Sequence, residues 1–450
     1  MRDFKWKLTG GITAVTAVGL ILTGCSGSPS GPSSGGLSGA PSSANQTVTI
    51  LGTVTGTEAQ EYIDAWTPWA TANNITIQYT GDRGFVDDLN TKVQANDVPN
   101  IALADPAQIS TYAQSGKIYE LDAAGTANVQ NNIPPSMAKY VEVNGKVYGT
   151  VLDGALKGFV WYSPATFAKY NVQVPTTWDQ LLTLTQTLQQ QTGAPVWCAG
   201  FNSQGANGWP GADFTSEVVL GSAGIDTFNS WVAGTTPFTD PAIANAFTES
   251  GKILLNPQYV NAGYGDVASI NATPFADVAN KLADGSCLLT NQATFLEASF
   301  ATATTAAGAQ PTIGPDGDIW AFLMPGPTAG SNSVMGGLDT AAAFTNDPAT
   351  MKVMAYLGSP EWATALAQVQ NASYLPVAKG VDPSIMSDPL MQSALKIVQD
   401  PNTTFALSAD DAMPNVVENA YWAGIVDWIN GTPQDQVLST IQASWADSGS

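Results

Sequence analysis

Short apolar runs alternate with longer amphipathic runs over residues 47–116, and this alternation limits the possible folds more than any other feature. The runs with the length and composition of strands are "TVTILGTV" (47–54), "ITIQY" (75–79) and "NIALAD" (100–105). The runs with helical periodicity are "TEAQEYIDAWTPWA" (57–70), "FVDDLNTKVQA" (85–95) and "PAQISTYAQSG" (106–116). A strand–helix order repeated three times predicts an α/β fold with a largely parallel sheet and helices on both faces.

Asn144-Gly145 stands between short alternating runs in "YVEVNGKVYGTVL". This dipeptide adopts the positive φ angles that a two-residue hairpin needs, so it predicts an antiparallel turn. No period of 20 to 50 residues is visible, which disfavours a repeat architecture.

The first 24 residues have the pattern of a secretory signal. Arg2, Lys5 and Lys7 precede an uncharged run from residue 8 to 24 that is short for a membrane span. "LTGC" then resembles the bacterial lipobox, in which Cys25 receives the lipid; an ordinary signal peptide with an incidental cysteine is the alternative. Ser, Gly and Pro make up 16 of residues 26–45, so we expect 25–46 to be a lipidated cysteine followed by a disordered tether.

Cys198 and Cys287 are the remaining cysteines. Outside the cytosol such a pair usually oxidises, so we expect a disulfide between them. Two buried free thiols are the alternative.

The charge of the chain disfavours several classes of partner. Residues 1–24 hold three of the 15 basic and one of the 37 acidic residues, so the rest has 12 basic against 36 acidic residues and a net charge of −24. This charge repels nucleic acid and anionic lipid, and it suits a neutral or cationic ligand. The chain has no histidine, and so lacks the commonest metal ligand and the commonest general base.

Over residues 47–450 the chain resembles the sugar-binding lipoproteins of bacterial ABC importers, which are relatives of maltose-binding protein (extracellular solute-binding protein family 1). The stretches that carry the resemblance are "YAQSGKIYELD", "NGKVYGTVLDGALKGFVWYSPATFAK" and "VPTTWDQLLTLTQTL". "WCAGFNSQGANGWPGADFTSEVVL", "FTDPAIANAF" and "CLLTNQATFLEASF" are similar to the α-glucoside-binding branch. The resemblance implies two α/β lobes that are joined by a hinge and close over a ligand cleft. We place lobe 1 at 47–155 plus 320–370, and lobe 2 at 156–319 plus 371–450.

The resemblance also implies candidate sugar-binding residues in the first lobe. A polyhydroxyl ligand needs aromatic faces, and it needs carboxylates or amides that bond in the plane of its ring. Glu58 follows the first strand, Arg83 the second and Asp105 the third, at strand ends where open α/β sheets bind ligands. A helix-dipole acid, a surface ion pair and a helix N-terminus are the respective alternatives. Asp153 and Lys157 stand near the first expected hinge crossing.

Further candidates follow in the second half of the chain. Trp209, in "NGWPGADF", is expected on a loop as a platform that stacks on a glucosyl ring, with a core anchor as the alternative. The other candidates are Asn207 and Asp213 beside it, Gln292 and Phe295 in "TNQATF", Gly336, Gly337 and Asp339 in "VMGGLDT", and Asp411, Asn415 and Trp422 near the C-terminus. Glycines at 336 and 337 let a ligand approach the backbone closely, or they only form a turn.

Three classes of function are compatible with this sequence. The first is a monomeric receptor without cofactor or metal, which binds a neutral α-glucoside or α-linked oligosaccharide and delivers it to the permease subunits of an ABC importer. The second is a secreted glycosidase, which needs two carboxylates about 5 to 10 Å apart. The third is an envelope scaffold, which would show repeats or a broad apolar patch. The resemblance favours the receptor, anchored outside the cytoplasm by its lipid alone.

Overall fold

The computed structural model describes residues 45–82, 84–261, 264–330, 333–369 and 374–448, apart from the side chains of Thr57 and Glu58. Residues 44–450 form one compact unit. The predicted signal peptide, Cys25, most of the tether and Arg83 lie outside the described residues.

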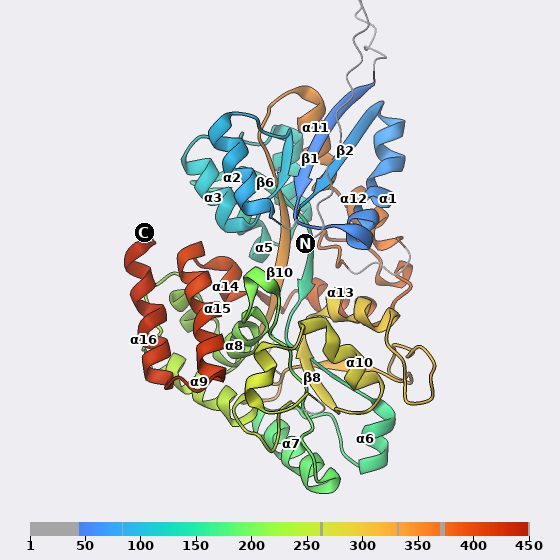
Figure 1. The fold of residues 1–450 in the computed structure, drawn as a ribbon. Coiled ribbons are helices and arrows are strands. Elements are labelled where there is room, and N and C mark those ends of the chain that lie inside the picture. The colour runs from blue at the N-terminus through green and yellow to red at the C-terminus, as the bar shows by residue number, and fades with distance from the viewer. Residues whose placement is uncertain (1–44, 83, 262–263, 331–332, 370–373, 449–450) are drawn as a thin grey trace, which may run out of the picture. The chain divides into compact units, whose positions relative to one another are not determined.

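Two main sheets organise the described chain (Figure 1). The larger is six-stranded and contains β1 (Gln46–Gly52), β2 (Ile75–Gly81), β3 (Ile101–Leu103), β6 (Gly149–Leu156), β10 (Ser333–Ala343) and β11 (Thr404–Leu407). The smaller has the order β8-β7-β9 and contains β7 (Phe159–Tyr162), β8 (Leu289–Gln292) and β9 (Trp320–Leu323). A separate hairpin pairs β4 (Glu142–Val143) with β5 (Lys146–Val147), as Asn144-Gly145 predicted.

The prediction of parallel strands is confirmed for the first half of the larger sheet. β1 pairs in parallel with both β2 and β3. The long strand β10 is antiparallel to β3 and β6 and parallel to β11, so the sheet as a whole is mixed. β11, which the sequence places in lobe 2, extends this larger sheet; the division into lobes stays a prediction.

Several helices begin where the sequence has a capping residue followed by proline. The N-caps Asp240, Asp347, Ser359 and Asp388 each accept a backbone N–H and each precede a proline, which fits the first helical turn. The helices before β8 are α1 (Gly56–Ala72), α2 (Phe85–Ala95), α3 (Pro106–Gln114), α4 (Ala123–Asn132), α5 (Pro135–Ala138), α6 (Pro164–Tyr170), α7 (Trp178–Thr192), α8 (Trp209–Val232), α9 (Pro241–Leu254) and α10 (Val278–Ala283). The helices after β9 are α11 (Pro348–Leu357), α12 (Pro360–Ala367), α13 (Pro389–Gln399), α14 (Ala409–Ala412), α15 (Asn415–Ile429) and α16 (Gln434–Ser444).

The chain passes between the two sheets at two places that lie side by side. From β6 to β7 it runs through Lys157 and Gly158, and from β9 it returns to β10. The backbone N–H of Lys157 donates to the carbonyl of Met335 at 2.8 Å, and that of Met324 donates to the carbonyl of Gly158 at 2.6 Å. Gly158 has φ +81°, a conformation that favours glycine. These bonds hold the two crossings together.

Buried apolar side chains form two clusters. The first packs around the larger sheet and includes Tyr62, Trp66 and Trp362, whose rings contact one another. The second includes Trp231 and Tyr421, with ring centroids 5.8 Å apart. Each cluster supplies the apolar burial that stabilises its part of the fold.

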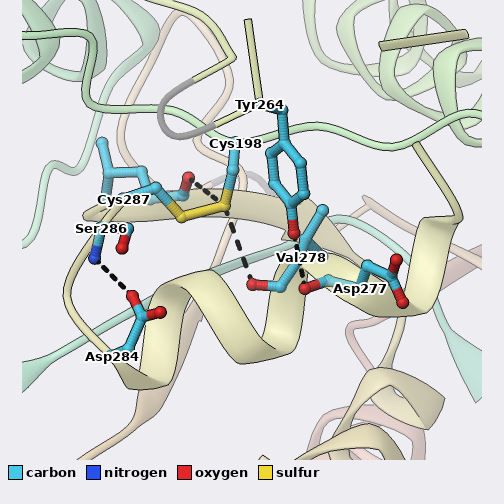
Figure 2. The surroundings of a disulfide bond; sticks show 8 residues. Cys198, Tyr264, Asp277, Val278, Asp284, Ser286 and Cys287 are labelled. Atoms are coloured by element: carbon cyan, nitrogen blue, oxygen red, sulfur yellow. Dashed lines mark hydrogen bonds between the residues drawn. A yellow bond between two sulfur atoms is a disulfide. The ribbon is translucent and has the colours of Figure 1, made fainter. Parts of the chain in front are cut away.

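The predicted disulfide is confirmed: Cys198 and Cys287 are bonded, with their Cα atoms 5.7 Å apart (Figure 2). The bond lies beside α10, where the Cys198 sulfur is 3.8 Å from the carbonyl oxygen of Val278. That approach is a packing contact, because a disulfide sulfur has no proton to donate. Asp284 accepts the backbone N–H of Ser286 at 2.8 Å and so orders the turn that leads to Cys287.

Within the described ranges, we find no helix that combines the length and the apolar character needed to span a membrane.

Candidate functional site

Lys157, at the crossing from β6 to β7, is the centre of a buried polar cluster. Its ammonium group lies 2.9 Å from Oδ1 of Asp213 and 3.2 Å from Oδ2 of Asp411, and it donates to the hydroxyl of Ser408 at 2.9 Å. Only 7% of Lys157 and 4% of Asp213 is exposed. Asp213 comes from α8, whereas Ser408 and Asp411 belong to the β11–α14 junction, so segments distant in sequence converge on one ammonium group.

Asp410 completes the cluster and links it to an aromatic side chain. Its Oδ2 accepts the indole N–H of Trp422 at 2.8 Å, and its Oδ1 is hydrogen-bonded to Ser408. The Ser408 hydroxyl also lies 2.8 Å from Oδ1 of Asp213, but it has one proton and can donate to only one carboxylate at a time. Charge repulsion within the cluster is therefore relieved by Lys157 and by protonation of a carboxyl.

The environment of these carboxyls raises their pKa values. Burial raises the pKa of Asp213 to about 8, against the opposing charge of Lys157. Burial also raises the pKa of Asp411 to about 7, although a third of that side chain is exposed and reaches solvent. Burial alone would lower the pKa of Lys157, but Asp213, Asp411 and Asp410 together raise it well above its usual value. Lys157 therefore stays protonated at neutral pH.

Three aromatic rings lie next to this cluster. The Lys157 ammonium is 5.7 Å from the ring centroid of Trp209, a cation–π arrangement. The Trp209 ring contacts Phe275 at 5.2 Å and Phe295 at 5.8 Å between centroids. All three rings are only partly buried, so their remaining area can contact a ligand. We call Trp209, Phe275 and Phe295 the aromatic group.

The expectation that Trp209 sits on a loop is wrong, because Trp209 is the first residue of α8. Gly208 before it has φ +103°, and a Cβ there would lie 2.2 Å from the carbonyl oxygen of Trp422. This close approach requires glycine, and Pro210 suits the first helical turn. The Asn207 side chain accepts the backbone N–H of Ser203 at 2.6 Å and is exposed.

The two candidate glycines have different surroundings, and both lie within β10 rather than at a turn. A Cβ at Gly336 would lie 2.5 Å from the carbonyl oxygen of Ala155, so close strand packing requires this glycine. A Cβ at Gly337 would meet only Oδ2 of Asp411 at 3.7 Å and Cε of Lys157 at 3.8 Å. Gly337 thus keeps open space beside the cluster.

Asp105 and Asp339 extend the acidic surface away from Lys157. Asp105 caps α3, where its backbone N–H donates to Oε1 of Gln108 at 3.1 Å, and its own carboxyl is exposed. Desolvation by crowding atoms and the charge of Asp339 raise the pKa of Asp105 to about 6, which leaves it ionised at neutral pH. Asp105 also acts on the pKa of Asp411, which places these two carboxyls near each other.

Four further predicted residues are not among the contacts of the Lys157 cluster, and two of them are buried. Asp153 is fully buried beside Tyr62 and Asp339, and burial raises its pKa well above the usual range. Gln292 is buried, and its side-chain oxygen accepts the N–H of Ala293 at 2.9 Å. Glu58 lies in the first turn of α1, and Asn415 begins α15 and is exposed.

The arrangement therefore has two layers. Lys157, Asp213, Ser408 and Asp410 form a buried floor. Above them, the side chains that reach solvent are those of Asp105, Trp209, Phe275, Phe295, Asp339, Asp411 and Trp422. Sequence reasoning missed Ser408, Asp410 and Phe275, because their spacing along the chain carries no signal. Among the residues that the structure covers, no group of three or more His, Cys, Asp or Glu is arranged to hold a metal ion.

Known proteins share this sequence pattern and fold. The chain is 29% identical to the osmoprotective compounds-binding protein GgtB of Synechocystis, over 88% of this chain and 92% of that protein. It is 27% identical to the alpha-glucosides-binding periplasmic protein AglE of Rhizobium meliloti, over 89% and 87% respectively. The crystal structure of the bacterial solute receptor AcbH, described as exclusive for β-D-galactopyranose, matches with a TM-score of 0.71 and 16% identity, over 90% of this chain and 99% of that chain.

A family model described as bacterial extracellular solute-binding protein matches residues 52–364. That match covers both sheets except for β11 and all of β1 but Gly52, together with the crossing at Lys157. The chain therefore belongs to the bacterial extracellular solute-binding protein family.

Proposed function

We propose that this protein binds a small polyhydroxylated solute, an α-glucoside or α-linked gluco-oligosaccharide, and delivers it to the permease subunits of an ABC importer. The observation that carries this proposal is the partly exposed ring of Trp209 beside the Lys157 ammonium group, which also contacts the partly exposed carboxylate of Asp411. A sugar ring presents an apolar face that packs on an indole, while its hydroxyl groups donate to carboxylates in the ring plane.

One relative supports the choice of an α-glucoside, and the name of a second is compatible with it. The name of AglE states that it binds alpha-glucosides, and that of GgtB states that it binds osmoprotective compounds. Both align along most of this chain. A small neutral glucoside is compatible with the ligand named for AglE and with the ligand class named for GgtB.

Binding would act on the crossing between the sheets. Lys157 belongs to that crossing through its backbone and to the candidate site through its ammonium group. A solute that contacts groups on both sheets stabilises the closed form of a two-lobed receptor by its difference in contacts between the closed and open forms. The permease would recognise that closed form. The protein acts as a monomer, held outside the cytoplasm by a lipid on Cys25.

Calorimetry with purified protein tests the proposal. We expect an α-glucoside such as maltose, trehalose or sucrose to bind, to raise the Tm by mass action, and to remain chemically intact. Galactose serves as the epimeric control, and sugar release is measured in parallel. Release of glucose would instead favour the secreted glycosidase. Absence of binding by every α-glucoside in a broad panel would contradict the proposed ligand.

A further inference from the structure

A second cavity of about 290 Å³ lies between the short helix η5 (Thr294–Ala301), the start of α13 and the loop 310–313. Its lining contains Thr294, Glu297, Phe300, Gln310, Asp388 and Met391. It shares no lining residue with the Lys157 cluster, and the aromatic group does not line it. The ligand-binding role proposed above therefore does not account for this cavity.

Two carboxyl groups face each other in the cavity. Glu297 and Asp388 both line the cavity, and burial together with the neighbouring Asp388 carboxyl raises the pKa of Glu297 to about 10. Oδ1 of Asp388 already accepts the N–H of Met391 at 2.7 Å, as the N-cap of α13. Neither carboxyl forms a salt bridge within the described residues. Glu297 consequently holds a proton at neutral pH, because no positive group beside it favours the ionised form.

A third polar group in the lining is an independent observation. Thr294 is fully buried, and its hydroxyl makes no hydrogen bond to any part of the chain that the structure describes. Oε2 of Glu297 is likewise buried without a hydrogen bond to a described residue. A buried polar atom without a partner costs about 1–3 kcal/mol, so two in one cavity indicate that a bound group supplies the missing bonds.

We infer that this cavity binds a small organic cation with a primary ammonium group. An ammonium group has three N–H donors, which match Thr294, Glu297 and Asp388. The remaining walls include Phe300, Ile313 and Met391, which suit an alkyl chain. Small-molecule sites combine mostly apolar walls with a few converging polar groups in this way. A hard metal ion takes six or more oxygen ligands, several of which would have to be water molecules in this cavity, and it would leave the apolar walls without a role.

Binding of a cation in this cavity changes the protonation state of Glu297. At neutral pH Glu297 carries a proton, and a bound ammonium group favours the ionised form of this carboxyl. The proton of Glu297 is then released to the solvent as the cation enters. A cation that is merely attracted to the acidic surface would release no proton from Glu297. Proton release on binding therefore distinguishes binding in the cavity from this general attraction.

Calorimetry with n-pentylamine near pH 8, in about 0.15 M salt and in buffers of different ionisation enthalpy, tests this inference. We expect saturable binding with proton release, and no binding of n-pentanol, which lacks the charge. Glu297→Gln should weaken n-pentylamine by about tenfold or more, because a charge-assisted bond is lost. Thr294→Val should weaken it to a smaller extent. Asp316→Asn, the same carboxyl-to-amide replacement at an exposed acid outside the cavity lining, is the matched control and should bind as the unaltered protein does.

Three outcomes would overturn the inference. One is no binding of n-pentylamine at millimolar concentration, and another is equal loss in the Asp316→Asn control. The third is saturable binding of CaCl2 without binding of the amine, which would make the cavity a metal site. Circular dichroism of each variant shows that it is folded, and retained α-glucoside binding shows that the Lys157 site is intact.

Discussion

The ammonium group of Lys157 lies 2.9 Å from the carboxylate of Asp213, and both side chains are buried where the chain crosses from the larger to the smaller sheet. The pair thus joins a strand crossing to the first turns of α8, the helix that begins with Trp209. A change at either residue should affect both stability and the geometry of the candidate site.

Replacement of Lys157 by Met should lower the free energy of unfolding by roughly 3–5 kcal/mol, because it leaves buried carboxylates without their cation. The loss should be smaller near pH 5, where Asp213 and Asp411 take up protons and no longer need the ammonium group. Urea unfolding at pH 5 and pH 8 measures both values. Equal losses at the two pH values would show that packing of the lysine chain, rather than its charge, explains the effect.

Stability should fall as the pH rises from about 5 to about 8. The folded-state pKa values of Asp213 (about 8) and Asp411 (about 7) lie above the ordinary value of 3.8. Between those limits the folded state binds more protons than the unfolded chain, so each pH step upward favours unfolding. Scanning calorimetry across this range tests the direction. Asp213→Asn should flatten the curve, whereas the exposed control Asp316→Asn should leave its slope unchanged.

Trp209→Ala should weaken binding of the correct sugar by roughly 1–3 kcal/mol, about 5- to 150-fold, because it removes the stacking face. Phe275 and Phe295 remain to support the fold locally. Trp69→Ala is the matched control. The Trp69 ring stacks on Tyr356 at 4.0 Å between centroids, and Tyr356 is not a residue of the Lys157 cluster or of the aromatic group. Titration calorimetry gives the affinities and circular dichroism the folding. An unchanged Kd would remove Trp209 from the site, and an unfolded variant would identify it as a core anchor.

Replacement of Cys198 and Cys287 by Ser should destabilise the protein by about 4 kcal/mol at most, from the closure of a loop of 89 residues. Sugar affinity should change little, because the bond packs beside α10, and the Cys198 sulfur contacts the carbonyl oxygens of Val278 and Leu289 rather than a residue of the Lys157 cluster. Thiol labelling of the unreduced protein provides the direct check. Quantitative labelling of two thiols would contradict the disulfide.

Cys25→Ser should release the protein from the membrane fraction while its affinity for sugar stays the same. The reason is the Ser/Gly/Pro-rich sequence of residues 26–45, which predicts a flexible tether between lipid and receptor. Fractionation followed by calorimetry on the soluble form measures both properties. Continued membrane retention of the variant would contradict the lipoprotein interpretation.

Local sequence signals predicted the first half of the larger sheet well. The expected helix at 85–95 and α2 coincide, and the hairpin at Asn144-Gly145 forms with both residues at positive φ. Periodicity and turn chemistry act over a few residues, so they can be read from one sequence. The antiparallel placement of β10 could not be predicted in this way, since it depends on strands about 180 to 240 positions away along the chain.

The candidate site was predicted less completely, for a related reason. Lys157 and Trp209 were singled out, but Ser408 and Asp410 were not, although both are hydrogen-bonded within the same cluster. Their separation from Lys157 exceeds 250 positions. The signal missed at Trp209 was Pro210, which indicates a helix start rather than a loop.

The dual use of Lys157 has a consequence for protein engineering. Its backbone N–H fixes the neighbouring crossing through Met335, while its ammonium group neutralises the buried acids. A library that varies position 157 would therefore mix changes in ligand preference with losses of folded protein. Variation at Trp209, Phe275 and Phe295, whose rings are partly exposed, offers a route to biosensors for other solutes, because it leaves the crossing and its buried acids unchanged.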